Sequence, residues 1–306
     1  MEKCIFIDGS GLVYRGFYAI PPFFKSPTGV QTNAVFGFSS ILLSLLTDYK
    51  PDHVAVMFDK KGPTFRHKEF AAYKATRTKA PQELYDQIPL VKEVVRAFKI
   101  PLLEADGYEA DDILATVARR LNNRHDIEIL IATGDFDLFQ IASRNTSILY
   151  PTKGFKQAEI IGVDDIFKKY SLRPEQIPDY KGLAGDSSDN IPGVKGIGDK
   201  GATALIGKYG SLEGIYAHLG EITGAIHGKL ETGKDSAFFC KKLATLRTDV
   251  PTDFDLEKCR VKDLDVNAVK KVFAEYGFKT LQKRIDELYG ITNDSAPTAN
   301  VQVSLF

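Results

Sequence analysis

The sequence predicts an α/β fold with a mostly parallel central sheet and flanking helices, followed by a mainly α-helical region. In the first half, short apolar runs typical of buried strands alternate with helical segments, which indicates crossover connections between parallel strands. The strand pattern fades near residue 163, where helices joined by Gly- and Pro-rich turns begin. We therefore expect an α/β core at 1–160, a helical region at 161–290 and a flexible tail at 291–306.

The expected elements follow from apolar spacing. Segments with apolar residues on one helical face are read as helices, and short Ile/Val-rich runs are read as strands. The expected strands are Cys4–Ile7, His53–Phe58, Pro101–Leu103, Ile127–Ala132 and Ser147–Leu149. The expected helices are Asn33–Asp48, Gln82–Phe98, Glu109–Leu121, Val163–Tyr170, Pro174–Ala184, Asp199–Tyr209, Ser211–Leu219, Ala237–Leu246 and Val266–Tyr276.

The composition is that of an ordinary globular protein. The 306 residues are 43% apolar and 26% charged, which excludes disorder, collagen and a disulfide scaffold. Three widely spaced cysteines form no CxxC pair, and no apolar run reaches the roughly 18 residues of a membrane span, so we expect a cytoplasmic protein without membrane contact. Forty basic and forty acidic residues give zero net charge, whereas nucleic-acid binders are usually basic. The net charge is only a sum, however, and it does not show where the charges lie.

Carboxylates gather where the expected strands end. Asp8 ends the first strand and Asp59 the second, and further acids follow the third and fourth strands and a turn of the helical region. Each could simply cap a helix, but parallel strands deliver all their ends to one edge, where the acids would repel one another without a counter-cation. The later acids are Glu109, Asp111, Asp112, Asp135, Asp137, Asp186 and Asp189.

The chemistry of this acid group indicates metal ions. It contains oxygen ligands and neither His nor Cys, which suits Mg²⁺ or Mn²⁺ rather than zinc. Nine carboxylates exceed what one ion can use, so two ions about 4 Å apart are expected. Such a pair activates water and stabilises the leaving oxygen of a phosphoryl displacement. The acids therefore predict metal-dependent phosphodiester hydrolysis.

Two segments carry positive charge suited to nucleic acid. Residues 60–79 hold seven basic residues against one acid, with aromatic residues interleaved, a pattern typical of single-strand binding, although a solvated loop is the plain alternative. Residues 191–202 place Gly193, Gly196 and Gly198 between Lys195 and Lys200. This pattern fits a helix-hairpin-helix that seats a duplex backbone without reading its sequence.

With these segments together, the chain resembles the 5′ nuclease domains of bacterial DNA polymerase I, within the flap endonuclease family. The resemblance covers about residues 3–290 and implies a PIN-like fold with a helical arch at about 60–80. The motifs that carry it are FIDGSGLVYR, MFDKKGPTFRH, AAYKATR, GYEADDILAT, IATGDFDLFQ, GDSSDNIPGVKGIGDK and KLATLRTD.

The resemblance implies a role for each matched residue. All nine acids named above match the family's metal-site acids, and Lys74 and Arg77 match the catalytic basic residues of its arch. The implied DNA contacts are Tyr14, Arg15, Arg66, Tyr73, Gly193, Lys195, Gly196, Gly198 and Lys200. The implied reaction is hydrolysis of DNA 5′ flaps and 5′ ends near single-strand/duplex junctions, in replication and repair.

The implied cofactors are two or more Mg²⁺ ions, replaceable by Mn²⁺, with K⁺ at the helix-hairpin-helix. The expected partners of a monomeric chain are branched or 5′-flapped DNA and RNA–DNA primer junctions. The end of the chain, Gln302–Phe306, also resembles a sliding-clamp binding motif, though the start of an interdomain linker is the alternative.

Several alternatives stay open at this point. A related nuclease of single-stranded RNA would not need the duplex-seating hairpin, and a non-catalytic binder of branched DNA would not need the acids. The sequence leaves undecided whether the chain is a standalone nuclease or an excised polymerase domain. It also leaves open whether endonucleolytic or exonucleolytic cutting dominates, and which group acts as a general base.

Overall fold

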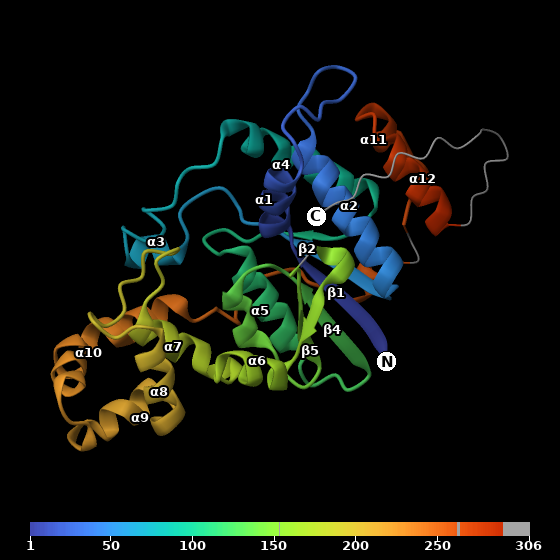
Figure 1. The fold of residues 1–306 in the computed structure, drawn as a ribbon. Coiled ribbons are helices and arrows are strands. Elements are labelled where there is room, and N and C mark those ends of the chain that lie inside the picture. Colours follow the sequence, from blue (N-terminus) through green and yellow to red (C-terminus); the bar gives the residue numbers. More distant parts are fainter. Residues whose placement is uncertain (153, 262–263, 290–306) are drawn as a thin grey trace.

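The structure, a computed structural model that describes residues 1–152, 154–261 and 264–289, is built on one six-stranded sheet. Its strand order is β3-β2-β1-β4-β5-β6 (Figure 1). The pairs from β3 to β5 are parallel, and only the edge strand β6 runs antiparallel to its neighbour. The strands are β1 (Glu2–Asp8), β2 (His53–Met57), β3 (Leu102–Leu103), β4 (Ile127–Ala132), β5 (Thr146–Tyr150) and β6 (Glu159–Ile161). The predicted fold class is confirmed.

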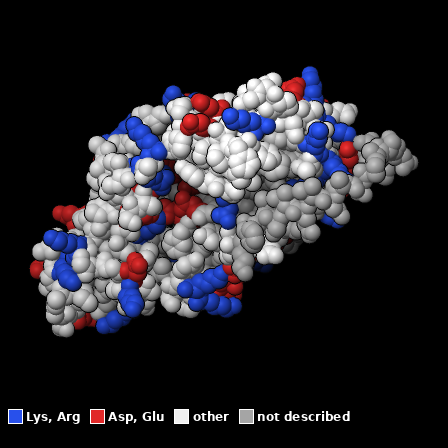
Figure 2. All heavy atoms as spheres, turned by 45° about the horizontal axis from the view of Figure 1, so that its top comes forward, with Lys and Arg blue, Asp and Glu red and all other residues white. Residues whose placement is uncertain are grey.

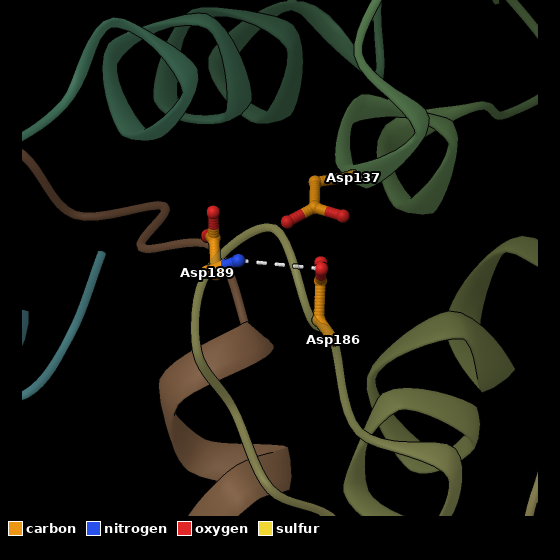
Figure 3. A group of neighbouring side chains, drawn as sticks. All are labelled: Asp137, Asp186 and Asp189. Atoms are coloured by element: carbon orange, nitrogen blue, oxygen red, sulfur yellow. Dashed lines mark hydrogen bonds between the residues drawn. The ribbon is translucent and has the colours of Figure 1, made fainter. Parts of the chain in front are cut away.

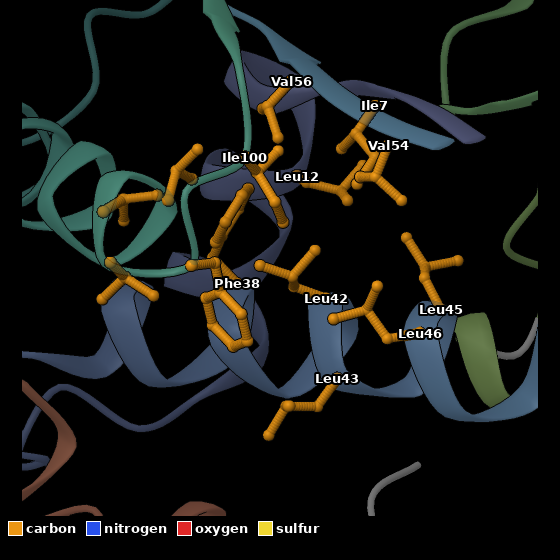
Figure 4. Close-up of a cluster of buried hydrophobic side chains, with 14 of the residues drawn as sticks. Ile7, Leu12, Phe38, Leu42, Leu43, Leu45, Leu46, Val54, Val56 and Ile100 are labelled. Carbon is orange, nitrogen blue, oxygen red and sulfur yellow. The ribbon is translucent and has the colours of Figure 1, made fainter. Parts of the chain in front are cut away.

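The central strands are apolar on both faces because helices cover both. In β1, Ile5 and Ile7 face one core, whereas Cys4 and Phe6 face the other. Helices α1, α2 and α4 cover the first face, and α5 covers the second. On the first face, Phe38 and Leu42 of α2 belong to the same buried cluster as Val56 of β2 (Figure 4). The helices on the two faces are α1 (Gly9–Ala19), α2 (Asn33–Tyr49), α4 (Gln82–Ala97), α5 (Ala110–Leu121) and α6 (Val163–Tyr170).

A separate small core holds the helical region together. It is formed by residues of α7, α8, α9 and α10 and of the turns between them. Helix α10 begins twelve residues before the expected Ala237. The sequence pattern missed its first half because that half is polar and has no apolar stripe. This half still packs closely, since a Cβ on Gly233 would lie 2.6 Å from the Val194 side chain. The elements are α7 (Ile177–Ala184), α8 (Asp199–Tyr209), α9 (Leu212–Ala217) and α10 (Ala225–Ala244).

The last two described helices return to the α/β core. Helix α11 (Val266–Glu275) contacts α4, and α12 (Lys279–Leu288) contacts α2. Phe273 and Ile285 are fully buried in the same cluster as Phe38. This differs from the expected grouping of 161–290 as one helical region, because the apolar faces of α11 and α12 match the core and not the small helical unit.

In the described ranges no helix is both long and apolar enough to cross a membrane. The tail expected at 291–306, with its Gln302–Phe306 motif, lies outside the described residues.

Candidate active site

Four acids meet at the carboxyl edge of the sheet, as expected. Asp8 is the last residue of β1, Asp59 follows β2 by two residues, and Asp135 follows β4 by three. These three strands are neighbours in the sheet, with β1 in the middle. Asp111 comes from the first turn of α5, which starts above the same edge. The topology therefore delivers the acids to one place from four separate segments.

Local hydrogen bonds hold these carboxylates in place. Asp8 caps α1 by accepting from the Gly11 amide at 2.8 Å, and it also accepts from the Thr133 hydroxyl at 3.0 Å. Asp59 accepts from the Ala110 amide at 2.8 Å. Asp135 caps the short helix η1 (Phe136–Ile141) by accepting a hydrogen bond from the Asp137 amide. Capping and ligand chemistry are thus compatible, since each carboxylate keeps free lone pairs.

The carboxylates of this first cluster repel one another. Burial raises the pKa of Asp8 to about 7, and repulsion from Asp59 and Asp135 adds to the effect of burial. Burial, together with Asp135 and Asp8, also raises the pKa of Asp111 well above its usual range. The pKa of Asp135 is raised mainly by burial, against the opposing charge of Lys181. Clustered carboxylates with raised pKa values are the setting that a divalent cation would stabilise.

A second group of acids lies beside the first. Asp137, Asp186 and Asp189 each offer an oxygen within 4.8 Å of the other two, and all three point toward one another (Figure 3). Asp186 and Asp189 lie in a turn that is not helical. The turn is closed by a bridge between Asp186 and Ile191, and the Asp186 carboxylate accepts from the backbone of Ser188 and Asp189.

Basic side chains of the chain itself contact these acids. Lys74 donates to Glu109 at 2.6 Å, and Arg77 donates to Asp189. Lys181 donates to both Asp137 and Asp186. Burial would raise the pKa of Asp186, but the Lys181 ammonium and Ser188 lower it to about 2. Glu109 is likewise buried, yet Lys74 and Arg66 hold its pKa below the usual value.

Lys181 is the site residue that the sequence analysis missed. It lies in α7, five residues before Asp186, and it is 5% exposed. A lysine in a short helix that also carries Asp179 reads as a solvent-facing residue, and only its burial distinguishes it. The one available signal was its spacing of five residues from an acid of the motif.

Arg66 and Asp112 have a role different from the expected one. Arg66 is 2% exposed, and its five N–H groups donate to Asp112 twice, to Glu109 and to the carbonyls of Leu243 and Thr245. The Asp112 oxygens also accept from the Glu109 and Arg247 amides. Because no donor of Arg66 and no lone pair of Asp112 remains free, the pair supports the site from behind. This corrects the expectation of a DNA contact and a metal ligand.

Tyr73 is also corrected by its burial. The side chain is 3% exposed, and its hydroxyl lies 3.1 Å from a Glu109 oxygen and 2.8 Å from an Asp189 oxygen. Burial raises its pKa strongly, and the two carboxylates add to that effect. A phenol held in this way bridges the two acid groups and offers no free face for a base.

The remaining expected DNA contacts are exposed, with the exception of Gly193. Tyr14 is 39% exposed and pairs with the hydroxyl of Tyr85, and Arg15 is exposed and donates to the Pro151 carbonyl at 3.0 Å. The hairpin residues follow the turn of Asp186 and Asp189 in the helical region, and Gly193 packs against Gly185 of that turn. Gly193 and Gly196 have φ of 63° and 84°, which favours glycine. Gly196, Gly198, Lys195 and Lys200 are exposed, whereas Gly193 is buried against the Leu183 carbonyl.

Seen from the surface, the two kinds of charge are sorted. Acidic side chains lie at the bottom of a hollow, and basic side chains flank it (Figure 2). The zero net charge therefore combines an acidic centre with basic surroundings. The acids can hold divalent cations, and the basic groups can contact phosphate.

Comparisons with known proteins agree with this arrangement. Residues 3–181 match the model of the 5′-3′ exonuclease N-terminal resolvase-like domain, and residues 172–267 match that of the 5′-3′ exonuclease C-terminal SAM fold. The DNA polymerase I of Caldicellulosiruptor bescii is 42% identical over 92% of the chain, and that of Bacillus subtilis is 40% identical over 94%. The chain spans 33% and 32% of the length of these two relatives.

Solved structures share the fold. A bacteriophage T5 flap endonuclease, in a pseudo-enzyme-product complex with DNA and metal ions, has a TM-score of 0.65 at 20% identity, with 95% of this chain and 99% of that chain covered. The catalytic core of Rad2 in complex with a DNA substrate has a TM-score of 0.62 at 19% identity, with 96% and 93% covered. The two matching domain models, which cover most of the core and the helical region, place this chain in the 5′-3′ exonuclease family.

Proposed function

We propose that this chain is a structure-specific 5′ nuclease that hydrolyses phosphodiester bonds of DNA 5′ flaps and 5′ ends near single-strand/duplex junctions. The observation that carries the proposal is the pair of acid groups at the carboxyl edge of the sheet, with Lys74 and Arg77 beside them. Solved relatives with this fold hold divalent metal ions or DNA, which supports the same partners here. Replication and repair, including removal of RNA primers and flaps, are the settings in which such junctions arise.

In this proposal the two acid groups hold two or more Mg²⁺ ions, with Mn²⁺ as a substitute. The first group would use Asp8, Asp59, Asp111 and Asp135, with Glu109 at its side, and the second the three acids of Figure 3. All donors are carboxylate oxygens, the ligands that these ions prefer. When bound, the ions would lower the pKa of water and stabilise charge on the leaving oxygen.

Lys74 and Arg77 would orient the scissile phosphate. Both side chains lie at the entrance to the acids, and both are charged, since acid neighbours raise their pKa values against the effect of burial. A phosphate that enters the hollow can accept from them in place of Glu109 and Asp189. Tyr14 and Arg15, on the exposed side of α1, would contact the strand outside.

The hairpin at Gly193–Lys200 would hold the duplex. Lys195 and Lys200 are exposed there, and glycines leave the backbone accessible to phosphates. K⁺ at this hairpin is part of the proposal, as is a monomeric chain. Clamp binding through Gln302–Phe306 is a separate proposal that rests on the sequence motif alone.

The experiment is incubation of the chain with an end-labelled 5′-flap duplex, in Mg²⁺ and in EDTA, with the products mapped at nucleotide resolution. We expect cleavage near the junction in Mg²⁺ only, leaving 5′-phosphate and 3′-hydroxyl ends. Asp135→Ala should abolish cleavage and keep flap affinity within tenfold, and full activity of this variant would refute the metal assignment.

Two parallel substrates distinguish the alternatives. A linear single-stranded RNA that is cut faster than the flap would favour the RNA nuclease. Binding of the flap without any cleavage, in Mg²⁺ or Mn²⁺, would favour a non-catalytic binder.

A further inference from the structure

Lys181 is a buried lysine inside the second acid group. Its side chain is 7% exposed, and its ammonium lies 2.5 Å from an Asp186 oxygen while it also donates to Asp137. These two acids and Asp189 are the ones whose oxygens come within 4.8 Å of one another. The ammonium therefore lies where a divalent cation bound by the same oxygens would lie.

The charges around this position are nearly balanced without a metal. Asp137, Asp186 and Asp189 supply three negative charges, and Lys181 and Arg77 supply two positive ones. One divalent cation carries the same charge as the two side chains together.

The backbone fixes both sides of this contact. Gly185 has φ of 77°, and a Cβ on it would lie 2.6 Å from the Ile191 carbonyl, so the turn that carries Asp186 has a single close-packed geometry. The amides of Asp186 and Ile191 bond each other's carbonyls at 2.8 Å. Lys181 comes from α7, which is packed against α10. Lysine and acids thus meet by construction of the fold.

We propose that Lys181 is the resident counter-cation of the second acid group and competes with the divalent ion for it. The inference rests on the proposed function only in that this group binds a divalent cation. Lys181 is a positioning residue that holds Asp137 and Asp186 at ligand spacing in the metal-free protein. The second ion must displace the Lys181 ammonium in order to bind, and this cost lowers the affinity of the site for the ion. If the role of Lys181 were purely structural, its replacement would leave the metal affinity unchanged or lower it.

The test is Mn²⁺ binding without DNA, measured by calorimetry on the whole chain. The event that is lost in Asp186→Asn defines the second site. In Lys181→Met we expect this event to become at least tenfold tighter, while Lys181→Arg, which keeps the charge, stays near the unsubstituted chain. Lys241→Met is the matched control, because Lys241 bridges Asp179 and Glu213 in the same region without touching either acid group.

An unchanged or weaker second event in folded Lys181→Met would overturn the proposal. If that variant does not fold, the unsubstituted chain labelled with ¹⁵N-lysine gives a second readout. The ammonium resonance that is absent from Lys181→Arg should shift or exchange faster as Mg²⁺ is added, and a resonance unaffected at saturating Mg²⁺ would overturn the proposal.

The outcomes separate this inference from the proposed function. If the chain binds two Mn²⁺ ions and cuts the flap, but Lys181→Met leaves the second event unchanged, only the counter-cation role fails. If the chain binds no Mn²⁺ and cuts nothing, both the proposed function and this inference fail.

Discussion

Substituting Asp8 by Asn should stabilise the metal-free protein at the expense of metal binding. Asp8 is 5% exposed, and its pKa is raised from 3.8 to about 7, chiefly by burial. A shift of this size corresponds to about 4 kcal/mol, the free energy by which the buried carboxylate is disfavoured once it is ionised. Asparagine has the same shape: its Oδ1 can still accept from the Gly11 amide, and its NH2 group can donate to the Thr133 hydroxyl, which reverses the direction of that bond.

The sign of the pH dependence follows from proton binding. Between about pH 4 and pH 7 the folded protein holds a proton on Asp8 that the unfolded chain has lost, so the free energy of unfolding falls as pH rises through this window. The cost of the carboxylate is about 2 kcal/mol at pH 5 and about 4 kcal/mol at pH 8. After loss of charge-assisted hydrogen bonds worth about 1 kcal/mol, Asp8→Asn should gain about 3 kcal/mol at pH 8.

Urea unfolding in EDTA at pH 5 and pH 8 measures this difference. Asp126→Asn is the control, because Asp126 is exposed, and hydrogen bonds from Arg124 lower its pKa to about 2, so its substitution should give no gain. Adding Mg²⁺ at pH 8 should stabilise the unsubstituted chain more than Asp8→Asn. An equal gain for Asp8→Asn at both pH values would refute the electrostatic reasoning.

Three further predictions concern other parts of the molecule. Lys74→Ala should slow single-turnover flap cleavage more than it weakens flap binding, because Lys74 lies beside Glu109; an unchanged rate would remove its catalytic role. Arg66→Met should cost about 3–5 kcal/mol in thermal or urea unfolding by leaving Asp112 buried and unpaired, and Asp112→Leu added to it should restore much of the loss; no recovery would contradict this pairing. Gly37→Ala should cost about 1–3 kcal/mol, because its Cβ would lie 2.6 Å from the Gly16 Cα, whereas Gly207→Ala, with open space around it, should stabilise α8 by about 0.5–1 kcal/mol; equal effects would contradict the packing argument.

The fold was predictable where the pattern is local. Strand β4 and helices α6 and α8 have the expected bounds, because apolar spacing alone defines them. Helix α1 was not predicted, since its glycines mask the pattern: Asp8 caps it, and Gly16 lets α2 approach closely. The edge strand β6 is too short to give a periodic signal. Helix α12 was missed as well, and its place in the core depends on contacts with distant segments.

The site was predictable only in part, for a related reason. The acids could be assigned to one edge because parallel strands end together. The buried pair of Arg66 and Asp112 behind these acids could not be predicted. Arg66 donates to the Leu243 carbonyl, which is 177 residues away in the sequence, and no local pattern indicates such a contact. Burial, and not residue type, separates Arg66 and Tyr73 from the exposed basic and half-buried aromatic side chains of the same segment.

The helical region leaves the core and returns to it beside the same short helix, η1. On the way out, Lys181 of α7 bonds Asp137, and on the way back Gln140 bonds the Ala244 carbonyl and the Leu246 amide. Helix α7 also packs against η1, so the outgoing side of the unit stays anchored when a bound ion displaces Lys181. If the hairpin holds the duplex as proposed, the fold sets the distance between the duplex and the acids. Duplexes of different sequence should be cut at the same offset from the end of the double helix.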